Sequence, residues 1–265
     1  MPTSFSFSPL SADKESCKEA SSSWLVRLDA DDVACPNRLQ LVAEHVAQWP
    51  HSGMFYSRAR LHQQTSAVSL NRTTEATPSE LRAQTQMGYL LSICHSSVVL
   101  NIQKTLALGG YRFNLHIEDL DLWWRMALAH DIVFIPEITV AYRLNSGGIC
   151  ATNLGALECE TLYAQYLLLS QLWNKPAHSY LQVQPVFQSF LEQSRLVYRE
   201  QMWKAAIAVS ARKYARAGRH MVVAACSAPS RFLERALYPI KRPAKIKIGA
   251  SPEAFRKNCQ QLWPA

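Results

Sequence analysis

The order of apolar and polar positions divides the chain into two parts that differ in kind. Up to about residue 150, short apolar and β-branched runs alternate with helical patterns, which is typical of an α/β domain. Beyond that point the apolar positions recur at helical spacing alone. We therefore predict a loose polar leader at 1–20, an α/β part at 21–150 and a helical extension at 151–265.

Runs rich in β-branched and aromatic residues predict the strands of the α/β part. The predicted strands lie at 24–28, 54–56, 89–100, 132–135 and 139–142, with Pro136 separating the last two. The paired glycines Gly109 and Gly110 predict a turn, because glycine tolerates positive φ.

Helices are predicted where apolar residues recur every three or four positions. In the α/β part they lie after Pro36, with Leu39, Val42, Val46 and Trp49 on one face, at the end of the loop-like stretch 63–84, and at 118–130. In the extension they lie at 157–173, 186–217 and 231–238.

Composition narrows the class of protein. Hydrophobic residues make up 48% of the 265 and charged residues 18%, which excludes wholesale disorder. The longest stretch without a charged residue, 83–103, is too polar for a membrane span, and the first ten residues carry no secretory signal. Seven cysteines without a CxxC pair favour free thiols, so we expect a cytoplasmic protein.

The net charge of +8 is concentrated near the C-terminus. Residues 195–265 carry 15 Lys or Arg against 3 Asp or Glu, whereas residues 1–194 are mildly acidic. A basic helical tail could contact an anionic membrane surface or an acidic protein partner, and a solvated helix face is the alternative. No nucleic-acid motif accompanies the charge, so we expect no nucleic-acid partner.

Two acidic clusters are candidates for chemistry. Asp29, Asp31 and Asp32 follow a predicted buried strand, where they would offer hard oxygen ligands to Mg²⁺ or Mn²⁺ at the carboxyl edge of a sheet. Glu118 and Asp119 open a predicted helix, where one carboxylate could act as a general base. The alternatives are a solvated turn for the first cluster and a structural helix cap for the second.

Four motifs occur in a characteristic order along the chain. They are LDADD at 28–32, GGYRFN at 109–114, EDLDLWWRMA at 118–127 and AYR at 141–143. Over about residues 20–150, this order resembles the family 2 glycosyltransferases, which have the GT-A nucleotide-diphospho-sugar transferase fold. The resemblance implies sugar transfer from a nucleotide diphosphate donor to an acceptor hydroxyl, with inversion at the anomeric carbon.

The resemblance also implies roles for individual residues. Asp31 would bind the metal ion, Mg²⁺ or Mn²⁺, with Asp29 on the nucleotide side of the donor. Asp119 would be the catalytic base, and Glu118 would shape the acceptor site. Arg143 would contact phosphate. A role for Trp123 in stacking on an acceptor sugar competes with burial of Trp123 and Trp124 in the core.

The chain departs from the family pattern in two places. Asn145 stands where many relatives have a histidine that can serve the metal or diphosphate. Only 28 residues precede Asp29, which is short for the first β-α units that would hold the base and ribose, so we expect an N-terminally truncated GT-A domain or a partner chain that supplies the missing strands.

Two other functions remain open at this point. One is a non-catalytic interaction module that binds a membrane, at the inner face, or a protein partner through its basic tail. The other is a metal-dependent phosphoesterase built on the same acids, although no histidine cluster with metal-ligand spacing accompanies them.

Overall fold

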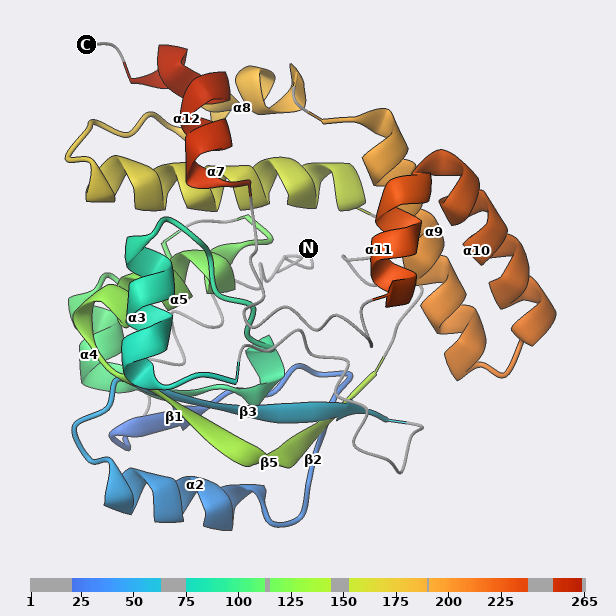
Figure 1. Cartoon of the computed structure of the whole chain (residues 1–265). Coiled ribbons are helices and arrows are strands. Elements are labelled where there is room, and N and C mark those ends of the chain that lie inside the picture. Colours follow the sequence, from blue (N-terminus) through green and yellow to red (C-terminus); the bar gives the residue numbers. More distant parts are fainter. Residues whose placement is uncertain are drawn as a thin grey trace, which may run out of the picture.

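A computed structural model describes residues 21–62, 75–112, 115–143, 153–189, 191–237 and 250–263; the predicted leader 1–20 lies outside them. Helices cover both faces of one mixed sheet (Figure 1), which confirms the predicted α/β class. The strands are β1 (Trp24–Val26), β2 (Val33–Ala34), β3 (Met54–Leu61), β4 (Val99–Asn101) and β5 (Ile132–Tyr142). The helices of this part are α2 (Arg38–Gln48), α3 (Pro78–Gln86), the 3₁₀ turn η1 (His95–Ser97), α4 (Ile102–Ala107) and α5 (Glu118–Ala129).

The strand order determines which loops meet. The five strands lie in the order β1-β4-β3-β5-β2; β4 is antiparallel to both neighbours, β3 and β5 are parallel, and β2 is antiparallel to β5. Hence β1, β3 and β5 point the same way, and their carboxyl ends share one edge with the start of β4. Because β1 and β2 are at opposite sides of the sheet, residues 27–32 cross the ends of the strands between them.

The prediction of two strands separated by Pro136 is wrong, because β5 runs through it. The register against β3 jumps from Ser57–Ile135 to Arg58–Ile138, so the proline lies at a bulge. On the other side of β5, β2 pairs with Val140 and Ala141, and no strand among the described residues pairs with Pro136 there. A proline is tolerated in a sheet at such a bulge or unpaired edge, where its missing N–H is not needed.

The long strand predicted at 89–100 is also largely wrong. Only its end belongs to β4, and the preceding residues form irregular buried chain followed by η1. The run is apolar because Leu90, Leu91 and Val98 are fully buried. Burial without alternation does not distinguish a strand from a packed loop.

Helix α2 confirms the element predicted after Pro36, but not its whole apolar face. Val42 is buried against the sheet, whereas Leu39 is 68% exposed and Trp49, which follows the last turn, is 47% exposed. Phe55, Val99 and Val133 complete this lower core between α2 and the sheet.

The opposite face of the sheet carries two further layers (Figure 1). Met54 and Tyr56 of β3 pack against Leu81 of α3 and Trp123 of α5. Above these helices, Trp124 of α5 packs in a third core cluster with residues of α7, α8 and α12. The bounds of the later helices are α7 (Leu154–Leu172), α8 (Tyr180–Ser189), α9 (Gln193–Ser210), α10 (Tyr214–Ser227), α11 (Pro229–Leu237), α12 (Pro252–Cys259) and the 3₁₀ turn η2 (Gln260–Leu262).

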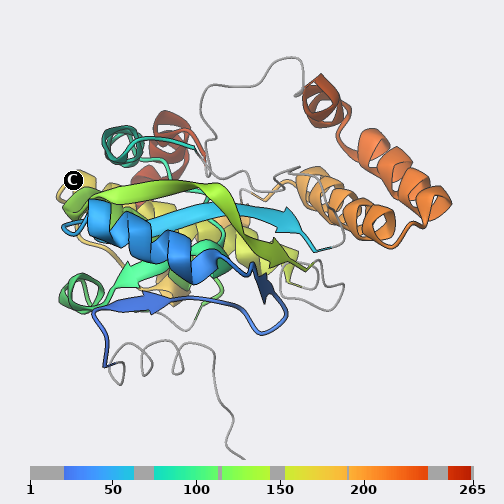
Figure 2. The same cartoon turned by 90° about the horizontal axis from the view of Figure 1, so that it is seen from below.

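The helical region predicted at 186–217 is therefore divided among α8, α9 and the start of α10. Helices α9, α10 and α11 pack mainly on one another and extend to the side of the layered body (Figures 1 and 2). No helix in the described ranges is long and apolar enough to cross a membrane.

Candidate active site

The first acidic cluster lies in the segment that crosses the carboxyl ends of the strands. Asp29 is half-buried, and the Ser96 hydroxyl holds it twice: it accepts from the Asp29 N–H at 3.0 Å and donates to the carboxylate at 2.9 Å. Arg27 forms a salt bridge with the other carboxylate oxygen at 2.9 Å. Asp29 is thus fixed in position before any ligand binds.

Arg38, at the start of α2, binds the backbone on both sides of this contact. Its guanidinium is 2% exposed and donates to the carbonyl oxygens of Arg27 and Ser96, both at 2.6 Å. One buried cation therefore joins the end of β1 to η1. Hydrogen bonds from a charged donor are among the stronger ones in proteins, so the joint is rigid.

Asp31 and Asp32 differ in exposure although they are neighbours. Asp31 is exposed, as a metal or diphosphate ligand must be. Asp32 is 8% exposed and accepts a hydrogen bond of 2.8 Å from the backbone N–H of Arg143. Burial raises the pKa of Asp32. Of the two, Asp32 has the structural role, and the Arg143 side chain is left exposed at the same edge.

The second acidic cluster begins α5, as the sequence predicted. Asp119 is half-buried, and its Oδ1 accepts a hydrogen bond of 2.6 Å from the Leu120 N–H. Burial raises the pKa of Asp119 to about 7, and the negative charges of Glu118 and Asp29 act in the same direction. The two acidic segments, far apart in the chain, are therefore close enough in space for the negative charge of Asp29 to act on Asp119.

Asp121 belongs to the same motif but has a different role. It is fully buried between Arg112 and Arg125, with contacts of 2.6 and 2.7 Å. Arg125 also donates to the carbonyl oxygens of Leu108 and Gly110, at 2.6 and 2.7 Å. Asp121 thus anchors the glycine turn to α5, where Gly109 and Gly110 have the predicted positive φ values of 87° and 61°.

The tryptophans of α5 are core residues. Trp123 is 0% exposed and Trp124 is 1% exposed, so the ring of Trp123 has no face open to an acceptor sugar. Its edge-to-face neighbour is His95 of η1, with 5.8 Å between ring centroids. Burial, and then the charge of Arg27, lower the pKa of His95 to about 4, so the imidazole is neutral at neutral pH.

His95 links Arg27, beside the first acidic cluster, to Tyr111 in the segment after the glycine turn. Its Nε2 accepts from the Arg27 guanidinium at 3.3 Å and lies 3.0 Å from the Tyr111 hydroxyl. No motif in the sequence indicated a role for His95, Ser96 or Arg38. The pair of small hydroxyl residues before a buried strand was the available signal for Ser96, whereas burial of Arg38 is visible only once the sheet is assembled.

The first acidic cluster has the donors that a hard divalent cation prefers. No group of three or more potential metal ligands occurs within the part of the chain that the structure describes. Mg²⁺, however, usually takes only one or two protein carboxylates and completes its shell with water and substrate phosphates. The exposed carboxylate of Asp31, two residues after Asp29, can supply one such ligand.

Comparison with known proteins points in the same direction. No model of a known protein family matches the chain. The chain is similar to the amylovoran biosynthesis glycosyltransferase AmsE of Erwinia amylovora, with 24% identity over 126 residues. The match covers 46% of this chain and 45% of AmsE, so it spans a little under half of each protein. This distant likeness suggests a glycosyltransferase and leaves its donor and acceptor open.

Proposed function

We propose that this chain is a metal-dependent, inverting glycosyltransferase of family 2 with a GT-A fold, which transfers a sugar from a nucleotide diphosphate donor to an acceptor hydroxyl. One observation supports this most. The first acidic segment follows β1 at the carboxyl edge of the sheet, and the negative charge of Asp29 acts together with burial and Glu118 to bring the pKa of Asp119 to about 7. Ligands of open α/β sheets bind at this edge.

Asp119 is the proposed base. A general base works best when its pKa lies close to the working pH, because it is then ionised often enough and still basic enough to take a proton. Asp119 satisfies this condition at neutral pH. The hydrogen bond from Leu120 orients its carboxylate, which would accept the proton of the acceptor hydroxyl as that oxygen attacks the anomeric carbon. Glu118, one residue earlier, would contact the acceptor.

The turn after β1 is the proposed donor site. Asp31, with Asp29 beside it, would hold Mg²⁺ or Mn²⁺, which when bound supplies positive charge that stabilises the departing diphosphate. The exposed Arg143 side chain would contact phosphate from the end of β5. Ser96 and Arg38 hold this turn in place, so binding the donor would not require ordering it first.

Donor hydrolysis and transfer assays on a panel of uridine, guanosine and thymidine diphospho-sugars with Mn²⁺ test this proposal. We expect Asp31→Asn to weaken the dependence on Mn²⁺, and Asp119→Asn to stop transfer while donor binding persists. The matched control is Asp131→Asn, which removes an exposed ion pair with Arg82 at the opposite end of β5. Wild-type turnover that does not exceed that of Asp119→Asn across the panel would contradict the proposal.

A second candidate function is supported by one surface. Val222 and Val223 on α10 are 63% and 44% exposed. Residues 211–227 contain four Lys or Arg and no Asp or Glu. An exposed apolar and basic helix face suits peripheral contact with an anionic membrane. Such contact is compatible with transferase activity, and it would be the whole function if the acidic site proved inactive.

A further inference from the structure

A second concave site lies away from the acidic edge, where the end of α7 meets α12 and η2. The last turn of α7 closes in a Schellman motif: Lys175 N–H donates to Ser170 O at 2.8 Å, and Asn174 N–H donates to Gln171 O at 3.2 Å. Asn174 has a φ of 50°, in the left-handed region that this motif requires. The motif turns the chain back and brings Lys175 to the rim of the cavity.

Trp263 fixes the opposite wall. Its indole N–H donates to the Ser170 hydroxyl at 2.8 Å, and its ring stacks on Tyr166 with 5.0 Å between centroids. The residue is only 8% exposed. A tryptophan held by both a hydrogen bond and stacking is a preformed surface and would lose little freedom when a ligand binds.

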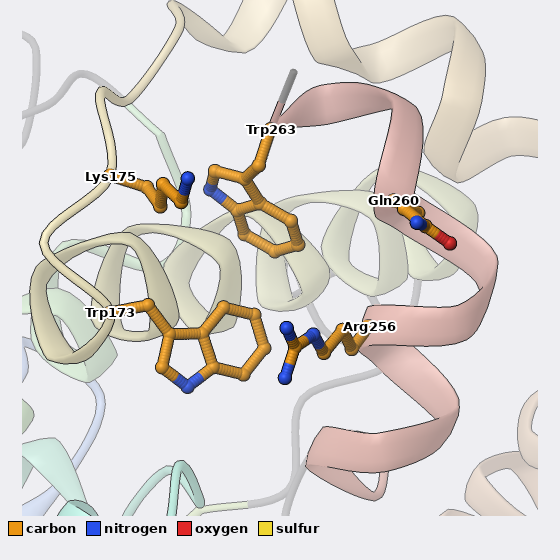
Figure 3. Close-up of a pocket in the computed structure, with 5 residues that line it drawn as sticks. All are labelled: Trp173, Lys175, Arg256, Gln260 and Trp263. Atoms are coloured by element: carbon orange, nitrogen blue, oxygen red, sulfur yellow. The ribbon is translucent and has the colours of Figure 1, made fainter. Parts of the chain in front are cut away.

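The cavity between these walls has a volume of about 240 Å³ and is lined by two indoles, two cations and an amide: Trp173, Trp263, Lys175, Arg256 and Gln260. Figure 3 shows Trp173, Trp263, Lys175 and Arg256 around the same space. Trp173 and Trp263 meet edge to face at 72°, so they form a corner and not a parallel slot. The Arg256 guanidinium lies over the Trp173 ring at 5.4 Å.

We propose that this cavity binds an anionic saccharide. Indole surfaces can pack against the apolar face of a pyranose ring, and a corner suits a puckered ring better than a flat base. Stacking on Trp173 holds Arg256 so that its N–H groups can donate to a carboxylate or phosphate. Lys175 adds a second positive charge at the rim, and none of the lining residues is acidic.

The size of the cavity indicates how much of the ligand it holds. Pockets for drug-sized ligands occupy about 300–1,000 Å³, so this one is suited to a single sugar unit. A neighbouring cavity of about 270 Å³ also has Lys175 in its lining, together with Arg112 and Trp124. A ligand of two or more sugars could therefore extend past Lys175 towards α5. The proposal stands on this geometry alone and does not require the transferase activity.

Titration of the full chain with small probes, followed by calorimetry and saturation-transfer NMR, tests the proposal. The probes are glucuronic acid, glucose 6-phosphate, glucose and inorganic phosphate. We expect one acidic sugar to bind at least about tenfold more tightly than glucose, because one hydrogen bond to a charged group is worth about that much. A preference for glucuronic acid identifies a carboxylated sugar, and a preference for glucose 6-phosphate identifies a phosphorylated one.

Variants locate the binding. Arg256→Gln should lose about tenfold in affinity, whereas Lys257→Gln, which removes the next cation on the same helix, should bind like the wild type. If Arg256→Gln does not fold, Lys175→Gln on the exposed loop is the second test. Binding of inorganic phosphate alone, equal affinity for glucose and both acids, or unchanged affinity in a folded Arg256→Gln or Lys175→Gln protein would overturn the proposal.

Discussion

The backbone N–H of Arg143 donates a hydrogen bond of 2.8 Å to the carboxylate of Asp32. This contact joins the end of β5 to the turn that follows β1. In the sheet, β4 and β3 separate β1 from β5. The side chains of Asp31, one residue before Asp32, and of Arg143 are both exposed. Asp32 is therefore the acid of the first cluster that has a structural role. It lies outside the D-x-D pattern, which consists of Asp29 and Asp31.

The first prediction concerns this contact. Asp32→Ala should lower the free energy of unfolding by about 1–3 kcal/mol, because the Arg143 N–H loses its acceptor in a partly buried position. Asp31→Ala, one residue earlier and exposed, should change it by less than about 0.5 kcal/mol. Urea unfolding of both variants measures the difference. Equal effects would mean that the Asp32 contact contributes nothing to stability.

The second prediction concerns Asp119 and pH. Its folded-state pKa, about 7, is above the ordinary value of 3.8, so the folded chain binds more protons than the unfolded chain between these values. The ionisation of Asp119 therefore lowers the free energy of unfolding as the pH rises from about 4 to 7, and this loss of stability persists above pH 7. Asp119→Asn removes this effect of ionisation, so the Tm of the variant should exceed that of the wild type at pH 8 and match it at pH 4. Each kcal/mol of unfolding free energy that the variant recovers should raise its Tm by about 2–4 °C.

Scanning calorimetry at the two pH values checks this, with Asp131→Asn as the control. A gain in Tm that is the same at pH 4 and pH 8 would show that it does not come from the ionisation of Asp119. Activity provides an independent readout: the rate of transfer should rise with pH up to about 7 and then level off, since the base must be ionised.

The third prediction concerns Ser96, which positions Asp29. Ser96→Ala removes both hydrogen bonds to Asp29, so we expect the KM for the donor to rise about tenfold with a smaller change in kcat. Ser96→Thr keeps the hydroxyl and should restore part of the loss. Ser97→Ala is the matched control, because the Ser97 hydroxyl donates only to the nearby Cys94 carbonyl at 2.8 Å. Equal KM values for the two alanine variants would argue against a positioning role.

The fourth prediction concerns Gln165 of α7, which is fully buried. Its amide donates to the carbonyls of Gly88 and Ala250, at 3.0 and 2.8 Å, and accepts from the Ala250 N–H at 2.9 Å. Gln165→Leu leaves these backbone groups unpaired and should cost about 2–4 kcal/mol of unfolding free energy. Gln171→Leu, exposed on the same helix, should cost less than about 0.5 kcal/mol.

A single unfolding transition in Gln165→Leu, shifted to lower urea, is the expected form of this loss. It would mean that the α/β layers and α7 unfold together. Two separate transitions would show that the helical part unfolds on its own, as a detachable extension would.

The fifth prediction concerns the exposed face of α10. The full chain should co-sediment with vesicles that contain phosphatidylserine and not with neutral vesicles, and added salt should release it. Arg216→Gln with Arg219→Gln should weaken binding about 30-fold, since each cation near the surface contributes about 1 kcal/mol. Lys204→Gln, whose cation is paired with Glu200 on α9, serves as the control. Equal sedimentation with both kinds of vesicle would rule out electrostatic attachment.

Local sequence patterns predicted the structure correctly where the residues of one element are enough to specify it. Helix α5 begins at the predicted Glu118, because its acidic first turn and apolar face are both readable along the chain. Local sequence patterns failed where the structure depends on contacts with neighbouring elements. By its residue type, Pro136 predicts the end of a strand, and only the unpaired side and the bulge of β5 explain why the strand continues. The buried irregular run before β4 likewise has strand-like composition without strand geometry.

By itself, the sequence determined the α/β class, the two acidic clusters and their order along the chain, since these depend on residue type and spacing over a few positions. Only the tertiary structure decided the surroundings of each acid. Asp31 is exposed, Asp32 and Asp121 are buried in structural contacts, and Asp119 has a raised pKa. The reason is physical: exposure, hydrogen-bond partners and pKa depend on groups brought together by the strand order, and residue spacing along the chain does not specify that order.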